Sequence, residues 1–309
     1  MGYYGEVVSD VYSVLSGQGE MTIQGMRFKV QWKQRGPYSV VLDNDSLNIA
    51  LGNTAPWQSS PSVYVQVKSE YIWSTGIEEM HRQTLDVVND LYMEASFREQ
   101  VSRVDVFADI AWSKPFQAGD IQKFSKRAKD TNTWEAHGQV TGFTVGKGKI
   151  QARIYDKALE LRRSGKDWLY DLWEVSQDSQ VWRVEFQLRR EALKEFGIES
   201  FDDLLKASPS LWDYLTGKWL SVRANKRLVS FWEAVQAAKF ATGDNPVQFV
   251  KRVKMRVGMT WEQAVNQIGG IVESCARRHE IEVYSTAFNE LIPRVRQRWI
   301  GNQRHKPDG

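Results

Sequence analysis

The sequence predicts an α+β protein in which helices flank a central antiparallel sheet and a helical region follows at the C-terminal end. Two patterns predict this fold class. Several segments alternate apolar and polar residues with a period of two, which is typical of strands with one buried face, and other segments place apolar residues at helical spacing. With 309 residues and 42% hydrophobic content, the chain is long enough to bury one large core or two modest ones.

These patterns divide the chain into three expected regions. Residues 1–60 mix short strand-like pieces with turn-rich segments and indicate an N-terminal extension or small subdomain. Residues 61–205 contain the clearest strands and form the expected sheet domain. Residues 206–309 have the apolar spacing of helices and form the expected C-terminal region.

The sheet domain has a predicted order of elements. These are a strand in 62–68, a helix in 76–96, a strand in 102–112, a hairpin in 142–157 and a strand in 181–190. The turn of the hairpin is the glycine-rich stretch Gly146–Lys149. The stretch 142–149 lacks the spacing and the Ser/Thr of a phosphate-binding loop, so we interpret it as a hairpin alone.

Charge is distributed unevenly between the two ends of the chain. Residues 218–309 hold 16 Lys/Arg against 8 Asp/Glu, whereas residues 1–217 hold 25 against 30. The basic third is a polyanion-binding surface or, equally well, a solvated helical face. Four of its cations lie on one short predicted helix and are the expected contacts to duplex DNA, in a helix-turn-helix-like arrangement. They are Lys251, Arg252, Lys254 and Arg256.

Composition excludes several classes of protein and site. No apolar run approaches the ~18 residues of a membrane span. The single cysteine, Cys275, allows no internal disulfide, and we expect a cytoplasmic protein. The four histidines form no HxH, HxxxH or HExxH pair, which argues against a histidine-based metal site and leaves a carboxylate-based one open.

The predicted strands carry ionic residues on the face opposite their aliphatic face. If these strands pair in one antiparallel sheet, the ionic residues converge. The alternative is cross-strand salt bridging on an exposed face. The residues concerned are Arg103, Asp105, Asp109, Arg153, Tyr155, Lys157, Arg183, Glu185 and Arg189.

Such a face has the groups needed for phosphoryl transfer. Neighbouring carboxylates bind a hard cation, and Mg²⁺ or Mn²⁺ suits them better than Zn²⁺. A tyrosine hydroxyl is a weak nucleophile near neutral pH unless a cation favours its phenolate. Tyr155 stands between Arg153 and Lys157 at alternate positions of a strand, so we expect these neighbours to lower the cost of its negative charge.

The motifs "RVDVFADI", "GFTVGKGKIQARIYDKALE", "VWRVEFQLRREALKEFGIESFDDLL" and "WLSVRANKRLVSFWEAV" occur in this order over roughly residues 60–235. In this respect the chain resembles the replication initiation factor family. That family comprises the Rep_trans initiators of rolling-circle plasmids, related filamentous-phage proteins and relaxases of some conjugative elements. The resemblance implies a site-specific DNA endonuclease and strand transferase with an HUH-like or RRM-like sheet, in which acidic metal ligands replace the histidine pair.

The resemblance also implies roles for individual residues. The tyrosine of the family's R-x-Y-[DN]-K pattern falls on Tyr155 and its lysine on Lys157, while the acid of the R-x-E strand falls on Glu185. The acid of the R-x-D strand falls on Asp105, with Asp109 as a helper. Arg153 and Arg183 are the accompanying cations.

The implied reaction is an attack of Tyr155 on a phosphodiester of single-stranded or extruded origin DNA, with Mg²⁺ or Mn²⁺ on the acids. A 5′-phosphotyrosyl enzyme and a free 3′-OH result. The implied partners are origin DNA with its adjacent duplex, a host helicase and a host polymerase. Whether the protein forms a homodimer, and whether it serves a plasmid, a phage or a conjugative element, stays open.

Two non-enzymatic functions compete with this interpretation. A DNA-binding regulator would use the charged sheet only to follow the phosphate backbone and would need neither Tyr155 nor a metal. An RNA-binding sheet would stack bases on exposed aromatic residues, whereas this face is mostly ionic. Among the tryptophans, we expect Trp168 and Trp173 to stack on bases and Trp212, Trp219 and Trp232 to pack between helices.

Overall fold

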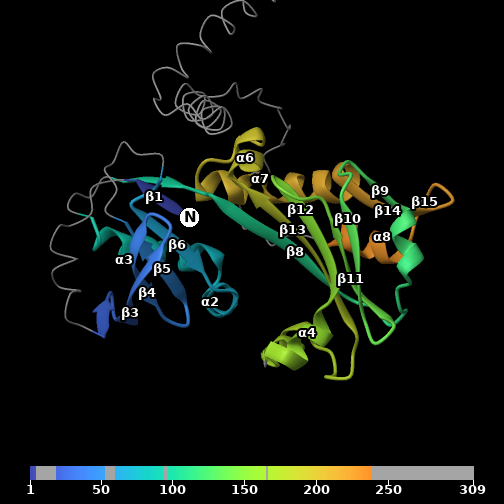
Figure 1. The fold of residues 1–309 in the computed structure, drawn as a ribbon, viewed down its shortest axis with the longest axis horizontal. Coiled ribbons are helices and arrows are strands. Elements are labelled where there is room, and N and C mark those ends of the chain that lie inside the picture. Colours follow the sequence, from blue (N-terminus) through green and yellow to red (C-terminus); the bar gives the residue numbers. More distant parts are fainter. Residues whose placement is uncertain (5–18, 53–59, 93–96, 165, 239–309) are drawn as a thin grey trace, which may run out of the picture. The chain divides into compact units, whose positions relative to one another are not determined.

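The computed structural model describes residues 1–4, 19–52, 60–92, 97–164 and 166–238. Within these ranges the strands form three sheets, of seven, five and three strands, in which neighbouring strands are antiparallel (Figure 1). Helices pack on the two larger sheets, so the predicted α+β class with a large antiparallel sheet is confirmed. No helix in the described ranges has the length and apolar character of a membrane span.

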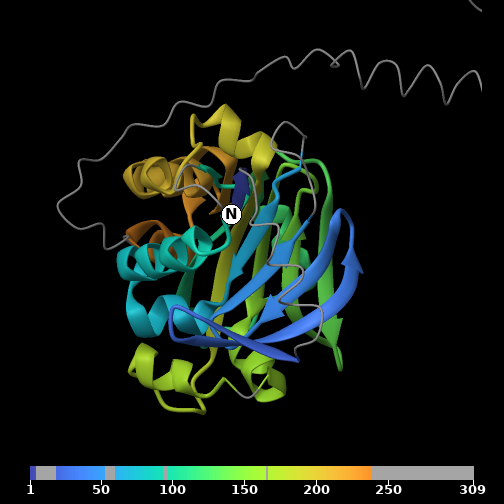
Figure 2. The same ribbon diagram turned by 90° about the vertical axis from the view of Figure 1, so that its left-hand side faces the viewer.

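The first sheet is built from residues 1–100 in the strand order β2-β3-β4-β5-β6-β1-β7. Helices α2 (Ser69–Thr75) and α3 (Ile77–Asn89) cover one of its faces (Figure 2), and α3 contributes Met80, Val87 and Val88 to the apolar core beneath. The strands are β1 (Gly2–Tyr4), β2 (Glu20–Ile23), β3 (Met26–Arg35), β4 (Tyr38–Asp43), β5 (Leu47–Leu51), β6 (Val63–Val67) and β7 (Arg98–Gln100).

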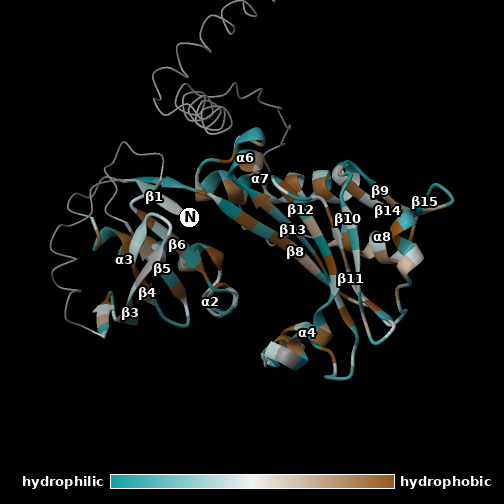
Figure 3. Ribbon diagram, in the orientation of Figure 1, coloured by the Kyte–Doolittle hydropathy of each residue, from teal (hydrophilic) through white to brown (hydrophobic). Residues whose placement is uncertain are grey.

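The second sheet has the strand order β10-β11-β12-β13-β8. Hydrophobic and hydrophilic residues alternate along its central strands (Figure 3), because one face packs on helices and the other carries the ionic residues. Strand β13 is in the interior of the sheet, and every residue from Val181 to Leu188 is buried. The strands are β8 (Arg103–Ala111), β10 (Thr131–Ala136), β11 (Gln139–Val145), β12 (Ile150–Asp156) and β13 (Val181–Arg189).

The apolar face of the second sheet packs on the helices that follow it. Trp212, Trp219 and Trp232 are buried in this core, which confirms their predicted role in helix packing. A three-stranded sheet, β15-β14-β9, adds Phe124, Leu220 and other side chains. The elements are β9 (Phe124–Lys126), α6 (Arg190–Glu195), α7 (Phe201–Tyr214), a π-helical turn η2 (Leu215–Trp219), β14 (Leu220–Ala224), β15 (Arg227–Leu228) and α8 (Ser230–Ala237), with the 3₁₀ helix η1 (Ala118–Lys123) before them.

The sheets do not divide at the residues expected from the sequence. Strand β6 pairs with β5 and β1 of the first sheet, although residue 61 was the expected start of the second. The expected boundary at 205 falls inside α7, whose later residues lie in the core of the second sheet. The alternation in β6 predicts a strand correctly but does not identify its partners. By sheet membership, the strands up to β7 belong to the first sheet, and those from β8 to β15 belong to the second and third sheets.

The predicted hairpin and the helix after it determine where the site lies. Strands β11 and β12 form the hairpin, with positive φ at Gly146 and Gly148 in its turn. Helix α4 (Lys157–Ser164) begins directly after β12, and the Asp156 carboxylate accepts from the backbone N–H of Leu159 at 2.8 Å. Helix α5 (Trp168–Trp173) packs against α4 through Leu161, Leu169 and other apolar residues.

Gly142 provides a test of this packing, because it lies opposite Tyr155 across the β11–β12 pair. A Cβ at this position would lie 2.8 Å from the Ile154 carbonyl oxygen and 3.1 Å from the Tyr155 Cβ. We expect Gly142→Ala to lower the free energy of unfolding by about 1–3 kcal/mol in urea titrations. Gly119, whose Cβ would meet no atom within 4 Å, is the matched control, and Gly119→Ala should change stability by less than about 0.5 kcal/mol. Equal effects of the two substitutions would contradict the close packing of β11 against β12.

Candidate active site

Three neighbouring strands bring the ionic residues together. Tyr155 of β12 lies opposite Arg183 of β13, which lies opposite Asp109 of β8. In the next row on the same face, Arg153 lies opposite Glu185. Directly opposed residues share one face of a sheet, so the predicted convergence of these side chains is confirmed.

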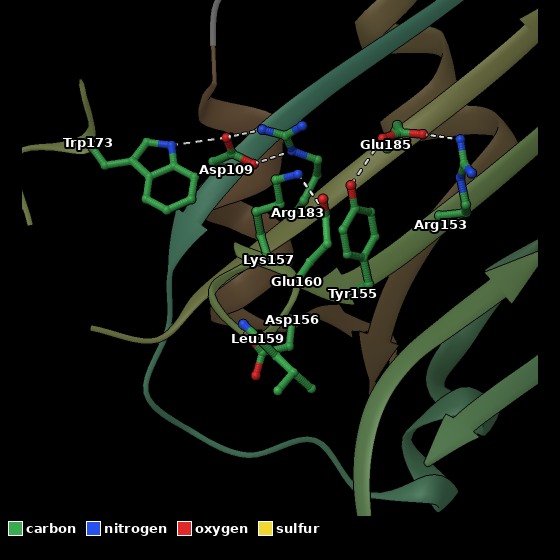
Figure 4. A network of polar contacts seen from close by, with 10 residues as sticks. All are labelled: Asp109, Arg153, Tyr155, Asp156, Lys157, Leu159, Glu160, Trp173, Arg183 and Glu185. Carbon is green, nitrogen blue, oxygen red and sulfur yellow. Dashed lines mark hydrogen bonds and ion pairs between the residues drawn. The ribbon is translucent and has the colours of Figure 1, made fainter. Parts of the chain in front are cut away.

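Glu185 is the centre of the first group of contacts (Figure 4). One of its carboxylate oxygens accepts from Arg153 Nη2, and the other accepts from the Tyr155 hydroxyl at 3.3 Å. The same Arg153 nitrogen is 3.7 Å from Asp105 Oδ2. Asp105 also accepts two hydrogen bonds from Arg103, at 3.0 and 2.6 Å. Two carboxylates therefore approach one cationic nitrogen beside the Tyr155 hydroxyl.

Asp109 belongs to a separate and more deeply buried pair. Its two oxygens accept from Arg183 Nε and Nη2, both at 2.7 Å, and Trp173 Nε1 donates to it at 3.0 Å (Figure 4). The Arg183 guanidinium also lies over the Phe107 ring, 3.7 Å from its centroid. Asp109 and Arg183 thus form a buried salt bridge, in which each charge has the opposite charge that it needs when it is removed from water.

Lys157 is the first residue of α4 and not, as the alternation suggested, a continuation of the strand. Its ammonium nitrogen is 2.5 Å from Glu160 Oε2 and 5.8 Å from the centroid of the Tyr155 ring. The lysine side chain is almost completely buried. Burial lowers the pKa of Lys157, and Arg183 lowers it further, although the Glu160 carboxylate acts in the opposite direction.

The expectation that neighbouring cations favour the Tyr155 phenolate is wrong for this arrangement. Burial raises the pKa of Tyr155, and the Glu185 carboxylate raises it further. Arg183 and Arg153 lower the pKa, but they do not outweigh these effects. The main reason is burial, which disfavours the charged phenolate, and each arginine also has a carboxylate partner close by.

The carboxylates fit a divalent cation only in part. Among the described residues, no group of three or more His, Cys, Asp or Glu side chains is arranged to hold a metal. Asp109 is occupied by Arg183 and Trp173. Asp105 and Glu185 do approach a common point, which the Arg153 nitrogen takes. Two carboxylates together with a substrate phosphate are a usual ligand set for Mg²⁺, so these two residues would supply two ligands to such an ion only after Arg153 moves away.

A pocket of about 520 Å³ opens beside Tyr155. Tyr155, Arg153 and Glu160 are among the residues that line it, so a ligand in the pocket would contact them. The remaining lining comes from the edge of the sheet, namely Trp134, Thr141, Gly142, Phe143 and Thr144. This volume lies within the ~300–1,000 Å³ of typical small-molecule sites.

The other predicted site residues have different positions. Trp173 donates its indole N–H to Asp109, and Trp168 packs against the cluster between α4 and α5, so neither is placed as an open stacking surface. Arg189 is exposed at the end of β13. The predicted duplex contacts Lys251, Arg252, Lys254 and Arg256 lie outside the described residues.

Sequence reasoning missed Glu160 and Trp134. Glu160 follows Lys157 by three residues in a predicted helix, which is the spacing of an ion pair and a usable signal. Trp134 lies in a segment that the sequence analysis left unassigned. The polar residues at alternate positions around it, "TNTWEAHG", would have indicated an edge strand followed by a turn.

Comparison with known proteins gives little further information. No family model matches the chain, and no curated protein matches it. One similar solved structure is that of a rolling circle replication initiator protein from Geobacillus stearothermophilus. The match covers 77% of this chain and 90% of that chain, with 16% identity and a TM-score of 0.46. A likeness at this level carries no argument about activity.

The two acids of strand β8 should differ in their effect on stability. Asp109→Ala leaves the buried Arg183 charge without its partner, and we expect a loss of about 3–5 kcal/mol in the free energy of unfolding. Asp105 is 31% exposed, and Asp105→Ala should cost less than about 1 kcal/mol. Urea titrations of both variants test the difference. Similar losses would contradict the assignment of Asp109 to a structural pair.

The raised pKa of Tyr155 predicts a specific dependence of stability on pH. A tyrosine whose pKa is higher in the folded state stabilises the fold fully below the ordinary value of 10.0, and this contribution is lost as the pH rises above it. Between about pH 9 and about pH 11, wild type should therefore lose stability relative to Tyr155→Phe, by up to about 1.4 kcal/mol per pH unit. The other tyrosines are present in both proteins, so their contributions cancel in the difference between wild type and variant. A gain relative to the variant would mean that the arginines favour the phenolate after all.

Proposed function

We propose that this protein nicks and rejoins single-stranded DNA, with Tyr155 as the nucleophile. One observation carries the proposal: the Tyr155 hydroxyl donates to the Glu185 carboxylate at 3.3 Å, on the border of a pocket that Arg153 also lines. A nucleophile hydrogen-bonded to a base, with cations nearby to receive a phosphate, is the arrangement required for covalent phosphoryl transfer.

The proposed reaction begins with attack of the Tyr155 oxygen on phosphorus, while the phenol proton passes to Glu185 Oε2. The bond between phosphorus and the 3′ oxygen breaks, and this oxygen takes a proton from solvent. The products are a 5′-phosphotyrosyl protein and a free 3′-OH, and the reverse reaction rejoins the strand.

Negative charge increases on the phosphate oxygens during the attack, and the site supplies positive charge for it. Arg153 lines the pocket and the Lys157 ammonium lies over the Tyr155 ring, so both cations would stabilise this charge. Arg183 is held by Asp109 and contributes through its field. Asp105 and Glu185 would hold Mg²⁺ or Mn²⁺, and such an ion supplies polarisation of a phosphate oxygen when bound.

The biological role that we propose is initiation of rolling-circle replication or of DNA transfer. Support for it comes from the order and spacing of the sequence motifs around Asp105, Tyr155 and Glu185. The partner is then an origin that presents a single-stranded or extruded nick site, and the basic residues after 238 are the proposed contact to adjacent duplex.

The decisive experiment is detection of a covalent protein–DNA adduct. Wild-type protein incubated with a pool of random-sequence single-stranded DNA and Mn²⁺ should give a denaturant-resistant adduct. Tyr155→Phe removes only the attacking oxygen and a hydrogen bond worth about 0.5–1.5 kcal/mol, so the fold should persist while the adduct disappears. Glu185→Gln should slow its formation by roughly 10²–10⁴-fold, the usual contribution of a general base. EDTA should abolish it, because the chelator removes the proposed Mg²⁺ or Mn²⁺.

Tyr170→Phe is the matched control, because Tyr170 is the nearest tyrosine in sequence after Tyr155. It is buried between α4 and α5, so this variant should form the adduct at the wild-type rate. An adduct in Tyr155→Phe would place the nucleophile elsewhere. Full activity in the presence of EDTA would show that the reaction needs no metal ion, and the proposed role of Glu185 would then be that of the general base alone.

A non-enzymatic DNA-binding regulator is the second candidate function. The observation that favours it is the pairing of Glu185 and Asp109 with arginines, since a binding face also needs its charges held in place. Absence of any adduct from wild type, together with salt-sensitive DNA binding, would establish this function instead.

A further inference from the structure

The sheet contains an aligned row of residues that the proposed reaction does not use. Trp134 of the edge strand β10 lies opposite Gly142 of β11, and Gly142 lies opposite Tyr155 of β12. Directly opposed residues share a face, so the two aromatic side chains project from the same side of the sheet with a residue between them that has no side chain. Neighbouring strands are ~4.8 Å apart, which places the two aromatic positions roughly 10 Å apart.

The gap above Gly142 is the part of the pocket that lies between these two aromatic residues. Trp134, Gly142 and Tyr155 all line the pocket of about 520 Å³. Any side chain at position 142 would reduce this space.

Trp134 is held as an open aromatic surface. Trp134 is 58% exposed, whereas tryptophans are highly buried on average. Its indole N–H donates to Thr144 Oγ1 at 2.8 Å, which fixes the orientation of the ring and leaves its surface as the part that contacts a ligand.

Polar groups border the gap on the same face. In the next row, Thr144 lies opposite Arg153, which lies opposite Glu185. The Thr144 hydroxyl has a hydrogen left to donate, because it accepts from Trp134. Arg153 also lines the pocket, and its side chain is 39% exposed. A ligand here thus meets an aromatic surface and, beside it, hydrogen-bond donors.

We propose that this gap receives one unpaired nucleobase of single-stranded DNA, stacked on Trp134, and that the stacked base determines which phosphodiester meets Tyr155. The inference rests on the proposed function, since it identifies the base-binding part of the same site. A nucleobase has both the flat surface that Trp134 would stack on and the acceptor groups that Thr144 and Arg153 would bind, and a bare phosphate has only the latter.

The experiment compares binding of two labelled probes by fluorescence anisotropy. One is a mixed-sequence single strand, and the other is an abasic strand of the same length with the same phosphates. All measurements use the full chain with Tyr155→Phe, which keeps the ring and forms no covalent product at this position. The parent should bind the base-containing strand more tightly. Adding Trp134→Ala should weaken that binding on the order of 5- to 100-fold, as expected for loss of one stacked base, and leave binding of the abasic strand unchanged. Trp134→Phe should restore most of the difference.

Trp32→Ala is the matched control, because Trp32 is similarly exposed, at 54%, but lies on β3 of the other sheet. It should change neither affinity. Equal weakening of both probes by Trp134→Ala, or no weakening of either, would overturn the inference. The test is independent of chemistry: if wild type forms no adduct but Trp134 still distinguishes the two probes, the nicking proposal fails and the base site remains.

Discussion

Strand β13 is covered on both faces, and this constraint determines the arrangement of the site. Helices cover its apolar side, and the ionic side chains of its neighbours cover the other. Arg183 and Glu185 are buried there, so each needs an opposite charge close by. Asp109 of β8 satisfies Arg183, and Arg153 of β12 satisfies Glu185. Because the charged residues of β13 pair with β8 on one side and with β12 on the other, they fix the register of all three strands. This register also fixes the position of the Tyr155 hydroxyl.

The same pairing separates two acids that look alike in the sequence. Asp105 and Asp109 are four residues apart on one face of β8, and alternation alone cannot distinguish them. Their neighbours in β13 distinguish them. Asp109 lies opposite Arg183 and forms a salt bridge with it, whereas Asp105 lies opposite Gln187 and approaches Arg153 instead. The difference in burial between the two acids therefore follows from a single register.

Local periodicity predicted most of the second sheet, including which side chains of β8, β12 and β13 share the ionic face. It could not predict the first sheet, because β6 and β7 resemble any other short strands and their partners are set by contacts distant in sequence. It also could not give the sign of the Tyr155 pKa change. The sequence shows Arg153 and Lys157 beside the tyrosine, but it does not show that Glu185 and Glu160 occupy them. The electrostatic field at the Tyr155 oxygen depends on which charges are paired with one another, and the tertiary structure determines that pairing.

Under the proposed function, the sharing of Glu185 between Arg153 and Tyr155 has a consequence for the resting protein. In the structure, Arg153 is paired with the Glu185 carboxylate, and burial beside that carboxylate raises the pKa of the Tyr155 phenol. A phosphodiester that enters the pocket competes for the same guanidinium. When Arg153 turns toward the phosphate, Glu185 is left with the Tyr155 hydroxyl as its partner. Under the proposed function, entry of the substrate therefore rearranges the hydrogen bonds around the nucleophile that attacks it.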